Sequence, residues 1–147
     1  MPLWKQQATL DLVNGWSPHT MIAALGIRFT DIGDDYLRGT MPVDERTHQP
    51  YGLLHGGASV TLAETLGSAA AMLCVDADKE VAVGLDINAN HVRGVRSGAV
   101  TGTARPIHIG RTTQVWEIRI EDEQQRLVCI ARLTVAIVPR QAIAPAA

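Results

Sequence analysis

The chain has 147 residues, of which 46% are hydrophobic, and a formal net charge of −2 at pH 7. This length suits one domain with a conventional core, and the composition suits a soluble globular protein. A nucleic-acid-binding domain normally carries a strong basic excess, so the charge balance argues against that class. It leaves room for a local cationic patch that binds a phosphorylated ligand.

The N-terminal segment, about residues 1–25, predicts one or two short helices. Thr9 or Asp11 can cap the first, Ser17-Pro18 can start the second, and Gly26 ends it. The segment lacks a basic start followed by an apolar stretch, so no secretory signal is expected. The cytoplasm is therefore the expected location.

A hairpin, a loop and a long helix are predicted next. Two strand-like stretches, GIRFTDIG and DYLRGTMPV, flank a turn at residues 33–35. Residues 44–55 contain Pro50 and Gly52 and are typical of a loop. Residues 56–75 predict a helix whose apolar positions go nearly all the way round, which indicates burial on most sides.

The second half of the chain predicts four strands. VAVGLDINANH alternates apolar and polar residues with period two, and GAVTGTARPIHIG, TTQVWEIRIED and RLVCIARLTVAIV supply three more strands. Their short connections favour antiparallel pairing. This order of elements fits one helix wrapped by a curved antiparallel sheet. We expect one domain over residues 1–147, with a frayed tail at residues 139–147.

A narrow polar stripe follows one face of the predicted long helix. Four polar residues recur there at i, i+3, i+4 and i+7, namely Thr61, Glu64, Thr65 and Ser68. Because a desolvated carboxylate is costly, Glu64 needs a partner or a wet cleft, and both settings are common at catalytic sites. A structural salt bridge or a solvent-facing glutamate is the plain alternative, and spacing alone leaves it equally open.

The start of this helix carries no side chains. Gly56 and Gly57 leave backbone N–H groups at the positive end of the helix dipole, where they can bind an anion or an oxyanion. Just upstream, Gln49 and His55 add groups that can hydrogen-bond a carbonyl, a water or a leaving group. Alternatively, the glycines only permit a tight entry into the helix.

Other chemistries find little support in the sequence. There is no HExxH, Cys/His cluster or paired-Asp motif, so we predict no metal and no cofactor. There is no GxSxG motif for a serine nucleophile. Cys74 and Cys129 lie 55 positions apart in apolar runs and read as buried free thiols of a reducing compartment.

The segment THQPYGLLHGGASVTLAETLGSAA closely resembles the hotdog-fold acyl-CoA thioesterases of the PaaI-like group. It is similar to the glutamate-type 4-hydroxybenzoyl-CoA thioesterases, the 1,4-dihydroxy-2-naphthoyl-CoA thioesterases and the proofreading thioesterases of aryl siderophore assembly. The likeness covers nearly the whole chain and includes MPVDERTHQPYGLLHGG, GLDINANHVRG and RPIHIGRTTQVWEI. It implies an α+β hotdog fold, in which about six antiparallel strands wrap a long central helix.

The resemblance also implies an activity, the hydrolysis of an aryl- or medium-chain acyl-CoA to free acid and CoA. Glu64 would attack the thioester carbonyl or act as general base on water, and the Gly56 N–H would polarise the carbonyl. Gln49 and His55 would orient the thioester and the water, and Ser68 would assist the water. A thioester is reactive enough for this chemistry without a cofactor.

Three parts of the sequence match the coenzyme A site of the family. They are Gly84, the segment HVRG and the segment HIGRTT, which together comprise Gly84, His91, Val92, Arg93, Gly94, His108, Ile109, Gly110, Arg111, Thr112 and Thr113. The resemblance implies that Arg93 and Arg111 neutralise phosphates. Taken alone, they also fit solvated turn arginines.

In this family the active site lies between subunits, with the loop of one chain facing the helix of its partner. We therefore expect a homodimer with a continuous sheet, paired into a tetramer, and no nucleic-acid or membrane partner. Three alternatives stay open. The chain could be a thioesterase for an acyl or aryl carrier protein, a hotdog hydratase or dehydratase, or a non-catalytic acyl-CoA-binding protein. The dehydratases need a different His/Asp arrangement.

Overall fold

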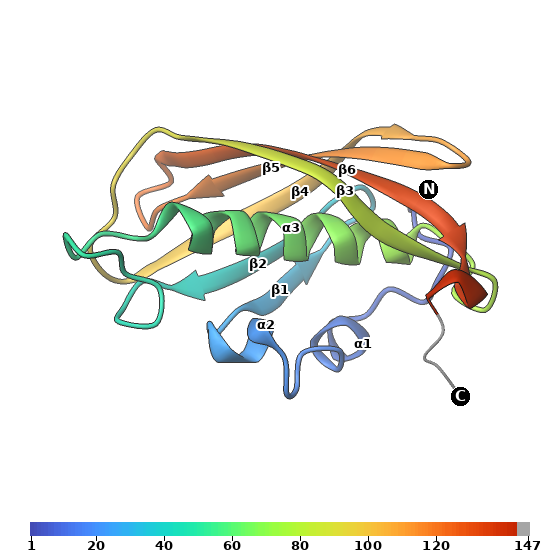
Figure 1. The fold of residues 1–147 in the computed structure, drawn as a ribbon, viewed down its shortest axis with the longest axis horizontal. Coiled ribbons are helices and arrows are strands. Elements are labelled where there is room, and N and C mark those ends of the chain that lie inside the picture. The colour runs from blue at the N-terminus through green and yellow to red at the C-terminus, as the bar shows by residue number, and fades with distance from the viewer. Residues whose placement is uncertain (144–147) are drawn as a thin grey trace.

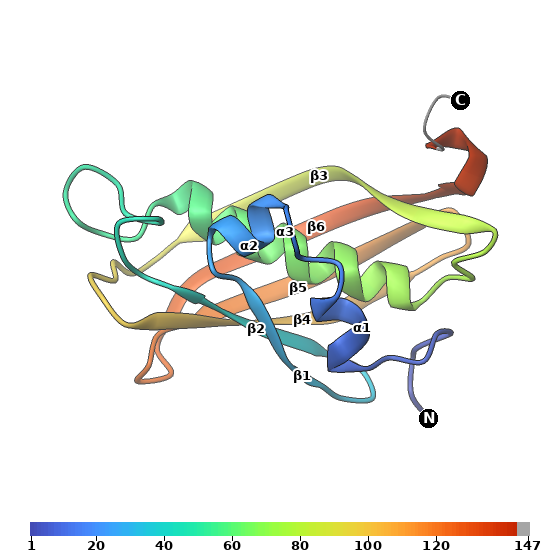
Figure 2. The same cartoon turned by 90° about the horizontal axis from the view of Figure 1, so that it is seen from below.

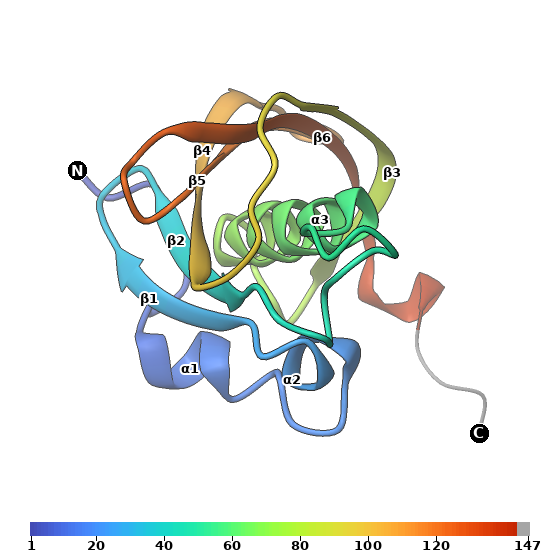
Figure 3. The same ribbon diagram turned by 90° about the vertical axis from the view of Figure 1, so that its left-hand side faces the viewer.

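The fold is one antiparallel sheet curled around one long helix, as predicted. The computed structural model describes residues 1–143, and its strands are β1 (Arg28–Ile32), β2 (Leu37–Pro42), β3 (Glu80–His91), β4 (Ala99–Ile109), β5 (Thr113–Glu121) and β6 (Leu127–Pro139). They pair in the order β1-β2-β4-β5-β6-β3. The helix α3 (Gly56–Leu73) lies along the concave face of the sheet (Figure 1), and the end-on view shows the sheet wrapping it (Figure 3).

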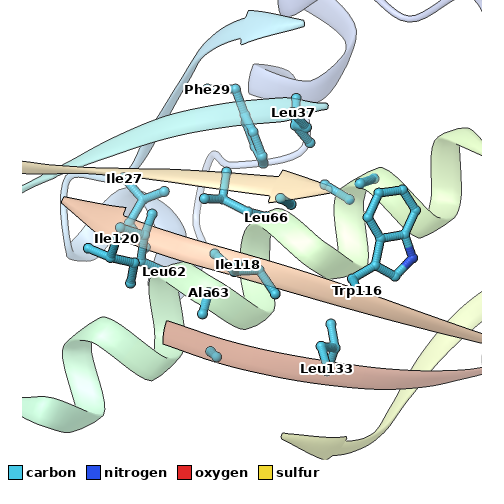
Figure 4. Close-up of a cluster of buried hydrophobic side chains, with 14 of the residues drawn as sticks. Ile27, Phe29, Leu37, Leu62, Ala63, Leu66, Trp116, Ile118, Ile120 and Leu133 are labelled. Carbon is cyan, nitrogen blue, oxygen red and sulfur yellow. The ribbon is translucent and has the colours of Figure 1, made fainter. Parts of the chain in front are cut away.

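Burial against the sheet holds α3 in place. The helix is rich in alanine and leucine, which favour helix formation, and Leu62 and Leu66 are fully buried. Trp116 and Ile118 of β5 and Leu133 of β6 pack around them in the core (Figure 4). Each large apolar side chain buried in this way contributes about 1.5–3 kcal/mol. This packing fixes which face of α3 stays away from the sheet.

Two short helices, α1 (Leu10–Asn14) and α2 (Met21–Ala24), lie along the side that the sheet leaves open (Figure 2). Thr9 caps α1, which is one of the two caps that the sequence allowed. The predicted start of the second helix at Ser17-Pro18 is wrong. His19 has φ 64 and interrupts the helical path, so α2 begins one residue after Thr20, whose side chain accepts from the Ile22 N–H at 3.2 Å.

The C-terminal end of β6 continues into a short 3-10 turn, η1 (Arg140–Ala142). The Arg140 side chain donates to the Ala77 carbonyl at 2.7 Å, and its backbone N–H donates to the Lys79 carbonyl at 2.9 Å. The rest of the predicted frayed tail, residues 144–147, lies outside the described residues.

Strand β3 forms one edge of the sheet and pairs only with β6. Its register shifts at a bulge between Gly84 and Asp86. Val83 and Leu85 are 36% and 63% exposed. Proteins seldom leave a long edge strand with exposed apolar residues unprotected, because it offers unpaired backbone groups to another strand. Over residues 1–143, no helix is long and apolar enough to cross a membrane.

Candidate active site

The Glu64 side chain lines a cavity of about 410 Å³ beside α3. Thr61, Thr65 and Ser68 line the same cavity, so the structure brings the predicted polar stripe together. This volume lies within the range of small-molecule sites, about 300–1,000 Å³. Glu64 is half-buried, and none of the salt bridges among residues 1–143 includes it. Of the alternatives for this acid, the cleft agrees with the structure and the structural salt bridge does not.

The other walls of this cavity were not predicted from the sequence. Trp16, Met21 and Ile22 contribute from the α1–α2 segment, and Phe29 and Ala82 contribute from β1 and β3. Trp16 and Met21 remain 38% and 61% exposed. No local spacing links them to α3, because they reach the cavity only through tertiary packing. The result is a mostly apolar pocket with one carboxylate on its wall.

The start of α3 presents one unused backbone amide. The His55 Nδ1 accepts from the Gly57 N–H at 2.7 Å, so His55 caps the helix with its side chain. For the Gly56 N–H, no hydrogen-bond acceptor is found among residues 1–143. This donor therefore remains available at the positive end of the helix dipole. A neutral His55 that accepts at Nδ1 carries its proton on Nε2, so the exposed ring edge is also a donor.

The Gln49 side chain is held by its own loop. Its Oε1 accepts from the Tyr51 N–H at 2.5 Å, while its backbone N–H donates to the Leu53 carbonyl at 2.8 Å. Because the amide oxygen is engaged, the NH₂ group is the part left to contact a ligand. Gln49 is thus prepared as a donor, like the Gly56 N–H and the His55 Nε2.

Gln49 and Gly56 line a second cavity, of about 390 Å³, together with His91, Arg93 and Gly94. The His91 ring covers Gly56 closely, since a Cβ atom at Gly56 would lie 2.8 Å from Nε2. The structure therefore joins the predicted loop residues to the first predicted CoA segment, HVRG.

The two cavities divide the five predicted catalytic residues. Glu64 and Ser68 line the first cavity, whereas Gln49 and Gly56 line the second. Eight residues of helix separate Gly56 from Glu64, which corresponds to roughly 12 Å along the axis. His55 stands next to Gly56 as its helix cap. Within one chain, the structure does not bring the five residues into one site.

The predicted CoA-binding segments are divided in the same way. Across the sheet, His91 pairs with Cys129, whereas Gly84 pairs with Val135, whose other partner is Gln114 at the start of β5. The segment from His108 to Thr113 comprises the end of β4, the turn and the first residue of β5, and it therefore lies toward the Gly84 end. Seven residues of strand separate Gly84 from His91, roughly 23 Å.

The arginines of these segments remain exposed. Arg93 and Arg111 form no salt bridge with any residue in the range 1–143. Val92 is 57% exposed and Ile109 is 38% exposed, so both segments present apolar as well as charged surface. A ligand with phosphates and an apolar arm would find matching groups on them.

Thiol and metal chemistry find no site in the described part of the chain. Cys74 and Cys129 are free and buried, and burial raises the pKa of the Cys74 thiol to about 12. A thiol with such a pKa is a poor nucleophile near neutral pH. Residues 1–143 contain no group of three His, Cys, Asp or Glu side chains placed to hold a metal ion.

Comparison with known proteins agrees with this fold. The family model described as Thioesterase superfamily matches residues 51–129. A 1,4-dihydroxy-2-naphthoyl-CoA hydrolase of Escherichia coli (strain K12) is 55% identical over 135 residues, which cover 92% of this chain and 98% of that protein. The proofreading thioesterase EntH of Cronobacter sakazakii is 53% identical over 135 residues, again 92% of this chain and 98% of the relative.

A solved structure gives the same result. The crystal structure of a variant of the thioesterase PA1618 from Pseudomonas aeruginosa is 55% identical in sequence and superimposes with a TM-score of 0.92. The match covers 93% of this chain and 99% of that one. The helix wrapped by a six-stranded sheet defines a hotdog protein. The chain belongs to the thioesterase superfamily, and its enzyme class is thioester hydrolase.

Proposed function

We propose that the chain hydrolyses an aryl- or medium-chain acyl-CoA to the free acid and CoA, at sites shared by two copies. Glu64 acts as nucleophile or general base, and the Gly56 N–H polarises the thioester carbonyl. Gln49 and His55 orient the thioester and the attacking water, and Ser68 assists that water. The expected cytoplasmic location is part of this proposal, since two free thiols suit a reducing compartment.

One observation carries the proposal, namely the unused Gly56 N–H at the start of a long helix. Gln49 and His55 add further donors near this N–H. Their acceptor atoms, Gln49 Oε1 and His55 Nδ1, already accept from the Tyr51 and Gly57 N–H groups, which leaves the Gln49 NH₂ group and the His55 Nε2 to contact a ligand. Such a cluster of donors suits an oxygen on which negative charge develops. Removal of one donor of this kind typically lowers the rate by about 10²–10³-fold.

The open edge of β3 supports a shared site. If two β3 strands pair antiparallel about a point between Ile87 and Asn88, residue 84 of one chain lies opposite residue 91 of the other. Glu64 lies beside Gly84 of its own chain, and Gly56 lies beneath His91 of its own chain. The pairing would therefore bring Glu64 of one chain close to Gly56 of the partner subunit. The same pairing would unite the two halves of the CoA site. It would also pair the backbone groups that the β3 edge leaves open.

The reaction balances with water as the only co-reactant. In the nucleophilic route, a Glu64 oxygen bonds to the thioester carbon and the carbon–sulfur bond breaks, which leaves a mixed anhydride and CoA thiolate. Water then attacks the anhydride, releases the acid and restores Glu64, while a proton passes to the thiolate. In the general-base route, Glu64 takes a proton from water as the water attacks the thioester carbon; the carbon–sulfur bond then breaks, and the proton passes from Glu64 to the leaving thiolate, which gives the acid and CoA.

The test is release of free thiol from benzoyl-CoA by the wild type and by Glu64→Gln. The proposal requires release by the wild type and a loss of at least about 10³-fold in kcat for the variant. Unchanged CoA affinity in the variant would show that it is folded. Tight binding of benzoyl-CoA without turnover by the wild type would instead indicate a non-catalytic acyl-CoA-binding protein. Turnover only of an acyl carrier protein would move the substrate to that class.

A further inference from the structure

One wall of the cavity beside Glu64 lies outside the part of the chain that the family model matches. Trp16 and Met21, from the α1–α2 segment, precede residues 51–129. Both are large apolar side chains that stay 38% and 61% exposed at the cavity. Exposed apolar surface that borders a cavity commonly marks a place where a ligand is covered. These two side chains are therefore in position to touch the acyl group of a bound thioester.

The composition of the cavity wall restricts that group. Glu64 is the only ionisable side chain that lines the cavity within the described chain. Among the residues that this chain contributes to the wall, an acyl tail with a carboxylate would find no cation and would be repelled by Glu64. An uncharged tail avoids both costs.

The same wall favours a ring over a flexible chain. Trp16, Met21, Phe29 and Met72 all line the cavity, so its wall includes two aromatic and two thioether side chains. Both kinds of group make favourable contacts with an aromatic ligand in addition to burying it. An alkyl chain gains only burial, and it loses more conformational freedom when it binds.

We propose that Trp16 and Met21 are specificity-determining residues that favour flat, uncharged aromatic acyl groups over alkyl chains. This inference rests on the proposed function, because it assumes that the thioester carbonyl is placed at Glu64. It assigns acyl selection to the α1–α2 segment rather than to α3 alone.

The test compares kcat/KM for benzoyl-CoA and octanoyl-CoA in the wild type, Trp16→Ala and Trp16→Phe. We expect Trp16→Ala to lower the value for benzoyl-CoA by about tenfold or more and that for octanoyl-CoA by less than about threefold. Trp16→Phe keeps an aromatic ring and should retain most of the preference. Met21→Ala should act in the same direction, with a smaller effect.

Leu10→Ala is the matched control. Leu10 lies on α1 and is 37% exposed, close to the value for Trp16, but it does not line the cavity. It should leave the ratio of the two kcat/KM values unchanged. Equal losses on both substrates in Trp16→Ala, or the same selective loss in Leu10→Ala, would overturn the inference.

A binding measurement separates this inference from the proposed function. Phenacyl-CoA, a thioether with the phenyl ketone but no cleavable thioester, is titrated into the wild type and Trp16→Ala by calorimetry. We expect the variant to bind it about tenfold more weakly. If the wild type cleaves no thioester but this difference appears, the proposed function fails, and the part of the inference that stands is the contact of Trp16 with the aromatic acyl group. If cleavage occurs but the affinities are equal, the inference fails and the function stands.

Discussion

The Glu64 carboxylate lies directly against the backbone of Gly84, so that a Cβ atom built on Gly84 would be 2.5 Å from the Glu64 Oε1. The bulge of β3 begins at the same residue. A side chain at position 84 would occupy the space that the acid now fills. Gly84 was expected to contact CoA, and the structure adds that it borders the proposed catalytic group.

Gly84→Ala should displace the acid and slow the chemical step. Because an error of about 1 Å at a reacting group can cost on the order of 10²-fold, we expect kcat on benzoyl-CoA to fall by about 10–100-fold. KM should change less than kcat does, since Arg93 and Arg111, rather than position 84, are the proposed phosphate partners. Steady-state kinetics of the purified variant provide the measurement.

The control for Gly84→Ala is the same change in a Glu64→Asp background. The shorter aspartate does not reach the new methyl group, so the alanine should lower kcat there by less than about threefold. A double-mutant cycle would thus show strong coupling between positions 64 and 84. A full loss in both backgrounds would mean that the alanine acts through the fold of β3.

His55 allows its role as a helix cap to be separated from its proposed role as a donor. In His55→Asn, the amide oxygen can still accept from the Gly57 N–H, so the free energy of unfolding should stay close to that of the wild type. His55→Ala loses the cap and should be less stable by about 1 kcal/mol. Both should lose activity, measured as kcat alongside urea unfolding. Full activity in His55→Asn would mean that His55 acts only as a helix cap and not as a donor to the substrate.

Shared sites predict that two inactive variants restore each other. Gln49→Ala removes a loop donor and Glu64→Gln removes the acid, so a mixed dimer contains one site with both groups intact. After unfolding and joint refolding in equal amounts, the mixture should recover about a quarter of wild-type activity. Refolding each variant alone is the control. Failure to recover activity, despite mixed dimers detected by mass spectrometry, would contradict a site built from two chains.

Arg93 and Arg111 are predicted to act on binding rather than on chemistry. Replacing either with Gln removes a phosphate partner and should raise KM by about tenfold with kcat changed by less than about threefold. Inhibition constants for CoA and dephospho-CoA, compared between wild type and variant, then identify the phosphate that each arginine contacts. Loss of an arginine that binds the 3′-phosphate should weaken inhibition by CoA but not by dephospho-CoA, which lacks that phosphate. Arg105 is salt-bridged to Asp35 and serves as the control. A loss of kcat at constant KM would refute the binding role.

Asp122, in the turn between β5 and β6, predicts a pH-dependent stability. Burial raises the pKa of this carboxyl, but hydrogen bonds from the Arg126 backbone and side chain and from the Gln124 N–H lower it more, so the pKa lies below its ordinary value. A lowered pKa stabilises the folded state above the unfolded pKa, near 3.9, and the effect is lost as pH falls through the folded value.

Asp122→Asn should therefore lower the Tm at pH 5–7, and the difference from the wild type should shrink below about pH 4. Calorimetric melting from pH 2.5 to 7 measures both curves. A difference that stays constant over this range would show that the ionised carboxylate is not responsible.

The sheet and α3 could be predicted because burial imposes a repeat on the sequence. The burial of β5 alternates with period two, and α3 is apolar on most sides. The alternation in the sequence of β3 does not carry over to burial, because Val83 and Leu85 are exposed. The helix α2 has only four residues, Met21–Ala24, which is too short for any repeat to show, and no pattern in the sequence marks the positive φ of His19 that precedes it.

The candidate site was predictable where local spacing defines it. The polar stripe around Glu64 and the bare helix start at Gly56 both follow from neighbours along the chain. The contribution of Trp16 to the cavity does not, because it depends on how α1 packs against β1. The contact of His91 with Gly56 likewise joins residues 35 positions apart, and only the path of β3 brings them together.

Because Glu64 and Gly56 line separate cavities of one chain, a monomer would contain no complete copy of the proposed shared site. The specific activity would then rise with protein concentration until all chains are dimeric. At low concentration, a cell that doubles the amount of this protein would therefore more than double the rate of thioester hydrolysis. Newly made monomers would hydrolyse no thioester until they dimerise.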